Sequence, residues 1–396
     1  MSFSIYPIKG HIDQIEGIYC DGISAGLKAN NNKDMGFIYS DSACDIEAVF
    51  TLNKFQAAPL KHYALYEKDF QTNFILINSK NANAMTGQKG IDDINTIFDS
   101  LKDKVDLINP IMSSTGVIGN PLPIEKIVKG ALNFDLSAKN GENLKNAIMT
   151  TDAYPKSCLY EVELENGSSF KIGAVAKGAG MINPNLATML CFITTDAAVP
   201  KEHMKELLEL NSHSTFNAIS VDGDTSTNDT VFLLATKKSN AYDKEAFKEA
   251  LRLVMHDMAM LMVADGEGAK KAVAFEVVGA FNNEEAEVAA KALSNSLLVK
   301  TALFGEDPNF GRIASTIGAS RVTCDENTLM ISYNDVIVFN KGEIVFNEEV
   351  EIQASKVLEK DSFKIKCDIG QGSGKFTAYG CDLGNEYVKI NADYRT

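Results

Sequence analysis

Three stretches of the sequence combine hydroxyl, amide and glycine residues in a way that suits chemistry on a carbonyl group. Taken singly, each could be a series of turns, because Gly and Asn are common turn residues. The second stretch favours a catalytic role, since it changes abruptly from Gly, Asn and Pro to an apolar run. The stretches are SSTGVIGNP at 113–121, KGAGMINPNLATMLCFITTDA at 177–197 and SVDGDTSTNDT at 220–230.

Thr188 is the candidate nucleophile. The sequence predicts it at the first position of a strand, after a tight segment that contains Gly178, Gly180 and Pro184. A strained turn there would push the carbonyl of Ala187 toward the Thr188 hydroxyl, and attack would cut the chain between these two residues. The freed α-amine, with a pKa of about 7.7 to 8.0, could then act as the general base for its own hydroxyl.

The elements expected to position these residues are a mixture of helices and strands without a regular βαβ alternation. Apolar spacing predicts a buried strand at 73–78 and helices at 123–132, 137–149, 201–210 and 244–263. The Met-rich face of the last helix is interpreted as core packing. From residue 320 onward, LMISY, VIVFN and YVKIN predict antiparallel strands. The pattern indicates an α+β fold.

Composition argues against several classes of function. The formal net charge is -15, with 53 acidic and 38 basic residues, and no basic stripe suits nucleic acid. The N-terminus does not resemble a secretory signal and no apolar run is long enough to span a membrane, so a cytoplasmic protein is expected. The five histidines and seven scattered cysteines lack metal-ligand spacing. In the 220–230 stretch, a calcium loop starting at Asp222 would need Glu where Leu233 stands.

Six separated motifs in one order resemble the ornithine acetyltransferase (glutamate N-acetyltransferase) family, nearly end to end. They are SSTGVIG, MTTDAYPK, KGAGMINPNLATML, SVDGDTSTND, LFGEDPNFGR and the ending YVKINADYRT. The resemblance implies a layered αββα-like sandwich of the self-processing, aminopeptidase-related type. It also implies cleavage between Ala187 and Thr188 into an alpha chain, 1–187, and a beta chain, 188–396. The two chains would form one intertwined catalytic body and assemble as a heterotetramer of two alpha and two beta chains.

The resemblance assigns roles to individual residues. Thr115 and Gly116 match the family's oxyanion-hole pair, and a hydroxyl with a glycine N–H suits that task. Substrate-binding positions carried over from the family include Lys177, for which we expect a carboxylate contact, and Glu267, for which we expect a contact to an amine. The full set is Thr151, Lys177, Thr188, Glu267, Asn391 and Thr396.

The implied reaction is acetyl transfer from N2-acetyl-L-ornithine to L-glutamate through an acetyl-Thr188 intermediate, as a step of arginine biosynthesis. No bound cofactor is implied. A bifunctional version would also use acetyl-CoA to make N-acetylglutamate. Two rival functions are a self-processed N-terminal-nucleophile aminopeptidase or amidase and a non-catalytic amino-acid-binding protein. Release of free acetate or amino acid would favour the first, and an uncut chain would favour the second.

One position departs from the family pattern. Where the family has an N-S-G-N-A-N loop, this chain reads NSKNAN, with Lys80 in place of glycine. A lysine there would matter only if the position needed positive φ or close approach of a ligand. We expect Lys80 to point outward without affecting the chemistry.

Overall fold

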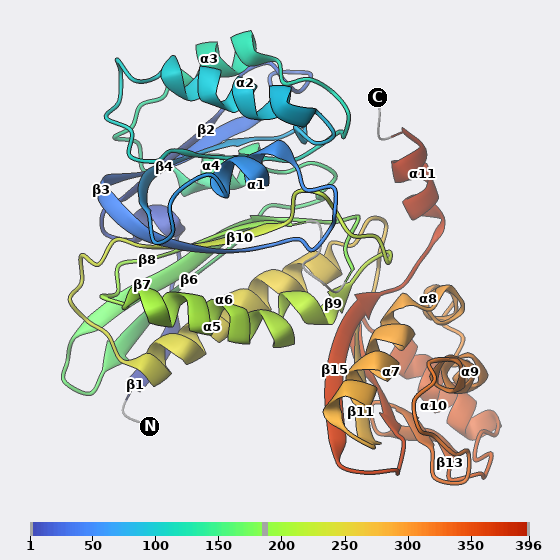
Figure 1. Cartoon of the computed structure of the whole chain (residues 1–396). Coiled ribbons are helices and arrows are strands. Elements are labelled where there is room, and N and C mark those ends of the chain that lie inside the picture. Colours follow the sequence, from blue (N-terminus) through green and yellow to red (C-terminus); the bar gives the residue numbers. More distant parts are fainter. Residues whose placement is uncertain (1–2, 184–188, 394–396) are drawn as a thin grey trace. The chain divides into compact units, whose positions relative to one another are not determined.

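The computed structural model describes residues 3–183 and 189–393, which form two compact units (Figure 1). The first unit comprises the described parts of 1–178, 185–216 and 225–259. The second comprises the described parts of 179–184, 217–224 and 260–396. Each unit therefore combines segments that are far apart in the sequence.

The first unit contains one sheet of nine strands among the described residues, in the order β1-β6-β7-β8-β10-β3-β4-β5, with β2 paired to β3. The long strand β3, Met35–Phe50, has β4 as its partner near Phe37 and β10 as its partner near Val49. An irregularity between Tyr39 and Cys44 interrupts its pairing with β4. The remaining strands are β1 (Phe3–Pro7), β2 (Ile18–Ile23), β4 (Gln71–Asn78), β5 (Ile111–Ser114), β6 (Lys156–Leu164), β7 (Ser169–Lys177), β8 (Leu190–Thr195) and β10 (Thr230–Ala235).

Strand β4 shows how this sheet is layered. Ile75 and Ile77 pack in a core with residues of β7, β8 and β10, so the sheet folds back over itself. Phe74 and Leu76 point the other way, into a core shared with helices α2 and α3. A strand buried on both faces needs apolar residues at consecutive positions, which explains the continuous run in its sequence.

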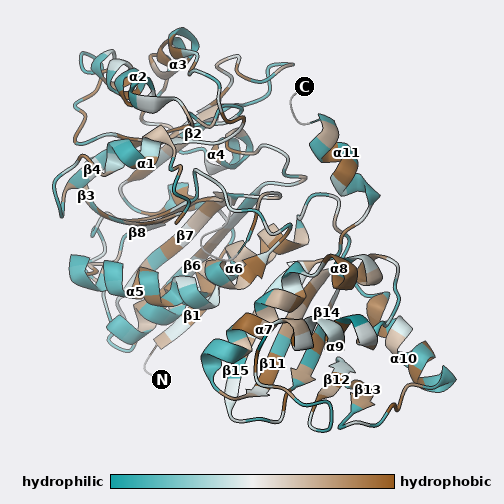
Figure 2. Ribbon diagram, turned by 45° about the vertical axis from the view of Figure 1, so that its right-hand side comes forward, coloured by the Kyte–Doolittle hydropathy of each residue, from teal (hydrophilic) through white to brown (hydrophobic). Residues whose placement is uncertain are grey.

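Helices cover the two outer faces of the folded sheet. α2 and α3 lie over β4 and β5, while α5 and α6 lie over the layer that contains β7 and β8, where Phe247 of α6 contacts Phe170 of β7 (Figure 1). The outward surfaces of α2 and α5 are largely hydrophilic (Figure 2). The resulting order of helix, sheet, sheet and helix confirms the predicted αββα-like α+β fold. The helices are α1 (Ala58–Tyr63), α2 (Gly87–Asp99), α3 (Ile124–Ala131), α4 (Gly141–Ala147), α5 (Lys201–Ser214) and α6 (Lys244–Ala264).

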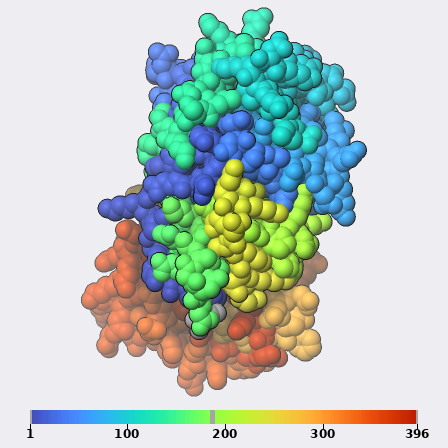
Figure 3. All heavy atoms as spheres, turned by 90° about the vertical axis from the view of Figure 1, so that its left-hand side faces the viewer, coloured from blue at the N-terminus to red at the C-terminus, as the bar shows by residue number. Residues whose placement is uncertain are grey.

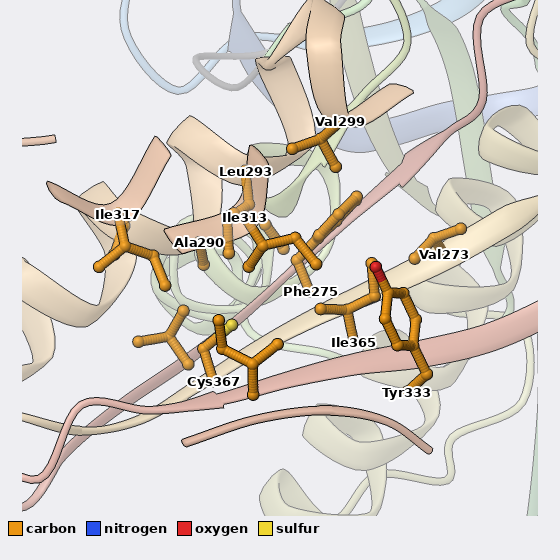
Figure 4. Packing of buried hydrophobic residues seen from close by; sticks show 14 of the residues in the cluster. Val273, Phe275, Ala290, Leu293, Val299, Ile313, Ile317, Tyr333, Ile365 and Cys367 are labelled. Atoms are coloured by element: carbon orange, nitrogen blue, oxygen red, sulfur yellow. The ribbon is translucent and has the colours of Figure 1, made fainter. Parts of the chain in front are cut away.

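The second unit has a six-stranded sheet in the order β13-β12-β14-β11-β15-β9, counted over the described residues. Side chains such as Phe275, Ile365 and Tyr333 point from its strands toward Leu293 and Ile313 of the covering helices, forming one buried cluster (Figure 4). The strands are β9 (Ile219–Ser220), β11 (Ala272–Ala280), β12 (Met330–Tyr333), β13 (Val336–Asn340), β14 (Ser362–Asp368) and β15 (Gly374–Cys381). The helices are α7 (Asn283–Asn295), α8 (Leu297–Phe304), α9 (Phe310–Ala319), α10 (Glu348–Leu358) and α11 (Asn385–Asp393).

Most of the predicted elements are present, with three differences. The buried strand and the helices at 123–132, 201–210 and 244–263 are confirmed. Of the four methionines on the predicted core face, Met255, Met258 and Met262 are fully buried, whereas Met260 is half-buried. The predicted helix at 137–149 is shorter, because the Asn140 side chain caps α4 by accepting a hydrogen bond from the Asn143 N–H. After residue 320 the strands are not purely antiparallel, since β14 pairs in parallel with β11.

The predicted strand YVKIN is wrong, because this segment lies in helix α11. No residue of α11 is buried, and Val388 is largely exposed. The alternation of apolar and polar residues there therefore does not reflect a buried strand face. An ion pair between Glu386 and Lys389, three residues apart, suits a helix instead.

Candidate active site

Strand pairing in the first unit brings together residues of two predicted functional stretches, 177–197 and 220–230, where β7 ends and where β8 and β10 begin. Leu190, the first residue of β8, lies opposite Lys177 of β7 on one side and Thr230 of β10 on the other. Met189 is fixed just before this point, since its carbonyl accepts a hydrogen bond from the Thr230 N–H. The predicted residues Ala187, Thr188 and Thr396 lie outside the described residues.

The predicted oxyanion pair, Thr115 and Gly116, follows the last residue of β5 in a tight turn. Gly116 has a φ of 135°, and a Cβ there would come within 2.2 Å of the Lys80 carbonyl carbon. Only glycine fits this close approach. Within the described part of the chain, neither the Thr115 hydroxyl nor the Gly116 N–H donates a hydrogen bond. Both donors are therefore available to an oxyanion.

Asn228, a residue that the sequence did not single out, links this turn to the third polar stretch. Its side-chain amide donates to the carbonyl oxygens of Ser114 and Ala82, at 2.8 and 2.6 Å. Ser114 in turn donates from its hydroxyl to the Asn78 side chain at 2.6 Å. Asn228 is buried, so these hydrogen bonds hold the end of β5 firmly beside the start of β10. The only signal in the sequence was its place in SVDGDTSTNDT.

Lys80 lies in the same turn, and its backbone corrects the expectation that it is harmless. Its φ is 75°, the left-handed region that glycine adopts without strain. The Lys80 carbonyl also accepts the Val117 N–H at 3.1 Å, beside the oxyanion pair. The position therefore does need positive φ, and lysine carries a conformational cost there.

Lys177 is brought close to a buried carboxylate. Its Nζ lies 3.9 Å from Asp152, whose other oxygen is 2.8 Å from the Nζ of Lys156, and all three side chains are buried. The Thr150 and Gly178 N–H groups donate to the same carboxylate. Burial alone would raise the pKa of Asp152, but Lys177, Lys156 and these donors outweigh it and hold the pKa well below its ordinary value. Asp152 is therefore a fixed negative charge beside Lys177.

Thr151 and Lys28 complete the polar residues in this region. Thr151, predicted as a substrate-binding residue, is half-buried and precedes Asp152 directly. Lys28 donates from its Nζ to the carbonyls of Lys33 and Ala147, and it was not predicted. Burial lowers the pKa of Lys28 to about 8, against the opposing effect of Asp34 and Asp152 and with a further contribution from Lys177. Three lysines, Lys28, Lys156 and Lys177, thus lie in this region with Asp152, and a lysine suits contact with a carboxylate ligand.

In the second unit, two of the predicted residues meet. The Asn391 side chain donates to the Glu267 carboxylate at 2.6 Å, although the two residues are 124 positions apart. The Glu267 N–H donates to the Ala179 carbonyl. A Cβ on Gly180 would come within 2.3 Å of the Glu267 carboxyl carbon, so a larger residue at 180 would displace it. Glu267 is nearly buried and keeps a defined position.

Residues 3–183 and 189–393 contain neither a candidate metal site nor a candidate membrane-spanning helix. These residues contain no group of three or more His, Cys, Asp and Glu side chains arranged to hold a metal ion. No helix there has both the length and the apolar character needed to cross a membrane. The Thr115 hydroxyl, the Gly116 N–H and the lysines and carboxyls described above suit acyl transfer.

Comparisons with known proteins agree along the whole chain. A family model described as the ArgJ family matches residues 19–396. A protein of Wolinella succinogenes named arginine biosynthesis bifunctional protein ArgJ is 58% identical, with 100% of both chains covered. A protein of the same name from Dehalococcoides mccartyi is 40% identical over 100% of this chain and 99% of its own. The crystal structure of the Bacillus halodurans protein of that name is 40% identical, with a TM-score of 0.50, and covers 52% of this chain and 99% of the matched chain.

Proposed function

The chain belongs to the ArgJ family, and we propose that it transfers the acetyl group of N2-acetyl-L-ornithine to L-glutamate in arginine biosynthesis. The observation that supports this proposal is that the end of β7 and the starts of β8 and β10 lie side by side in the sheet. It brings Lys177 and Asp229 to either side of the segment that directly follows Thr188. Asn228, just before β10, holds Ser114, the residue that precedes the Thr115–Gly116 turn.

The chemistry proceeds in two half-reactions. The Thr188 hydroxyl attacks the acetyl carbonyl and passes its proton to the Thr188 α-amine, while Thr115 and Gly116 donate to the oxyanion. Collapse of the tetrahedral intermediate breaks the amide bond, ornithine leaves with the proton, and the acetyl group stays on Thr188. The glutamate amine then attacks this ester, regenerating the hydroxyl and releasing N-acetylglutamate.

We assign partners to two charged groups of the substrates, the shared α-carboxylate and the side-chain ammonium of ornithine. Lys177, with Thr151 beside it, would bind the α-carboxylate that ornithine and glutamate share. Glu267 would bind the ornithine side-chain ammonium, and its hydrogen bond from Asn391 fixes the orientation of its carboxylate. Thr396 would contribute its hydroxyl and terminal carboxylate as a further substrate contact.

Chain cleavage between Ala187 and Thr188 is part of this proposal. The alpha chain, 1–187, and the beta chain, 188–396, would stay together because β8 and β10 of the second pair with β7 and β3 of the first. Helix α6 adds a contact through Asp257, which accepts a hydrogen bond from Tyr160, and segments of the two halves lie side by side on the face seen in Figure 3. The Bacillus halodurans chain is about half as long as this one, which supports processed halves in a relative.

Two further proposals concern the assembly of the chains and a second acetyl donor. We propose a heterotetramer of two alpha and two beta chains in the cytoplasm, with no bound cofactor. The curated relatives are named bifunctional, which supports a second reaction in which acetyl-CoA acetylates glutamate. One acetyl-Thr188 intermediate would serve both donors.

The decisive experiment is denaturing electrophoresis with N-terminal sequencing of the purified protein. We expect two fragments of nearly half size, one of which begins at Thr188. Thr188→Ala should abolish both cleavage and transfer, because no hydroxyl remains to attack either carbonyl. Thr194→Ala is the matched control, since it removes a buried hydroxyl of β8 that has no hydrogen-bond partner among the described residues, and it should still be cut. An uncut wild-type chain with full activity would contradict the proposal.

A further inference from the structure

Self-cleavage poses a problem that the transfer reaction does not. In the uncut chain the nitrogen of residue 188 belongs to a peptide bond, so it cannot act as the base for the Thr188 hydroxyl. The same nitrogen must also gain a proton when the bond to Ala187 breaks. Another group must therefore accept the Thr188 hydroxyl proton and donate a proton to the nitrogen of residue 188. The inference below rests on the proposed cleavage.

Asp229 holds the backbone that leads away from the scissile bond. One of its carboxyl oxygens accepts the Met189 N–H at 3.1 Å, and the next residue, Thr230, donates to the Met189 carbonyl at 3.0 Å. Only three covalent bonds, about 4.3 Å in total length, join the Met189 nitrogen to the nitrogen of residue 188. Asp229 is thus anchored within one residue of the bond to be cut.

The second oxygen of Asp229 is buried and uncommitted. The side chain is fully buried, and this Oδ2 makes no well-formed hydrogen bond to any described residue, although the Ser226 and Thr51 hydroxyls lie beside the carboxyl. A buried carboxylate with one bare oxygen is costly, which favours the neutral acid. Burial raises the pKa of Asp229 well above its ordinary value, and the Met189 N–H, Ser226, Lys177 and Thr51 oppose it less strongly.

The buried carboxyl of Asp152 differs from that of Asp229 in its partners. The two carboxyls are both buried, and both feel Lys177. Asp152 has two lysines and two N–H donors and stays ionised, whereas Asp229 has one N–H donor. When the pKa values of two carboxyls in one region are shifted in opposite directions, the one with the raised pKa suits a proton donor and the other a fixed negative charge. Asp229 fits the first role and Asp152 the second.

We propose that Asp229 is the proton carrier of self-cleavage at Thr188. As the Thr188 oxygen bonds to the Ala187 carbonyl carbon, the carbon–nitrogen bond between Ala187 and Thr188 breaks. The carboxyl proton of Asp229 goes to the leaving nitrogen, and the hydroxyl proton of Thr188 replaces it on Asp229. Water then hydrolyses the resulting ester, giving the Ala187 carboxyl group and restoring the Thr188 hydroxyl.

The test compares Asp229→Asn and Asp229→Ala in the full-length chain, with cleavage followed by denaturing electrophoresis after a pulse of cell-free synthesis. Asparagine keeps an oxygen that can accept the Met189 N–H and matches a neutral carboxyl in charge and shape, but it cannot exchange a proton. We expect both variants to cleave at least about a hundredfold more slowly than wild type. If Asp229 served only to hold Met189, Asn would cleave at the wild-type rate and only Ala would fail, and that result would overturn the proposal.

Two further arms keep the result interpretable. Asp196→Asn is the matched control, because Asp196 is also a buried carboxyl, follows the opposite end of β8 and has a pKa raised by burial; it should cleave normally. Uncut Asp229→Asn should melt within a few degrees of uncut Thr188→Ala, which shows that it folds. Hydroxylamine cleaves esters, so rapid cleavage of Asp229→Asn in hydroxylamine would mean that the ester forms without Asp229 and would refute its role. A wild-type chain that never cuts would instead refute the proposed function itself.

Discussion

Replacing Lys156 with Met tests the buried charges beside Lys177. The Lys156 and Asp152 side chains are completely buried, 2.8 Å apart, and methionine would fill the same space without a charge. Removing one partner of a buried ion pair costs about 3–5 kcal/mol. Lys177 at 3.9 Å and two N–H donors would still face Asp152, so we expect the lower end, about 3 kcal/mol.

Lys89→Met is the matched control. Lys89 and Asp93 are also four residues apart and 2.7 Å from each other, but the Lys89 side chain is 68% exposed. An exposed pair contributes about 1 kcal/mol or less. Urea unfolding followed by circular dichroism measures both variants, since the chain has no Trp for fluorescence. The urea midpoint should fall clearly for Lys156→Met and hardly change for Lys89→Met. Equal effects would refute the conclusion that burial makes the Lys156 pair special.

The stability lost in Lys156→Met should depend on pH. The pKa of Asp152 is held below its ordinary value, so its ionised form adds stability above the unfolded pKa of about 3.9, and that stability is lost as pH falls through the folded pKa. In Lys156→Met the pKa of Asp152 moves back up. The difference between variant and wild type should therefore be full near neutral pH and shrink in acid. A difference that stays constant down to the acid transition would contradict a charge-based cause.

Three further substitutions probe the site. Thr115→Val should lower acetyl transfer by about a hundredfold while leaving the melting temperature nearly unchanged, because the hydroxyl donates to no described residue; a loss under about threefold would remove Thr115 from the oxyanion site. Glu267→Gln should lower kcat/KM for N-acetylornithine about tenfold, because one charge-assisted contact is lost, and should change the KM for glutamate little. If the variant and the wild type react at the same rates with both substrates, Glu267 has only a structural role. Lys80→Gly should relieve about 1 kcal/mol of left-handed strain and raise the melting temperature by about 2 °C in a thermal scan, whereas a lower temperature would show that the lysine side chain stabilises the loop.

The sequence alone was sufficient to predict elements whose pattern is set by residues close together along the chain. The continuous apolar run of β4 and the periodicity of α6 are local patterns, and both elements lie where predicted. The candidate loops were also visible, because hydroxyl, amide and glycine residues are unusual beside apolar runs. Thr188 was interpreted as a nucleophile from its place before an apolar run, whereas the family resemblance supplied the roles of Thr115 and Lys177.

Local pattern failed where an element had no buried face. The segment YVKIN alternates like a strand, but α11 buries none of its residues, so periodicity carried no information about it. Lys80 was misjudged for a related reason. Its positive φ and the close approach of Gly116, from another part of the chain, leave no local pattern in the sequence.

Tertiary structure decided which polar groups act together. Asp152 and Asp229 are both ordinary acids in the sequence, yet one is surrounded by two lysines and the other has a single N–H donor. Their pKa values diverge because burial and partners, unlike residue type, are set by strand pairing between distant segments. Asn228 likewise gained its role only when the strand ends met, since a hydrogen bond across 114 residues leaves no periodic trace in the sequence.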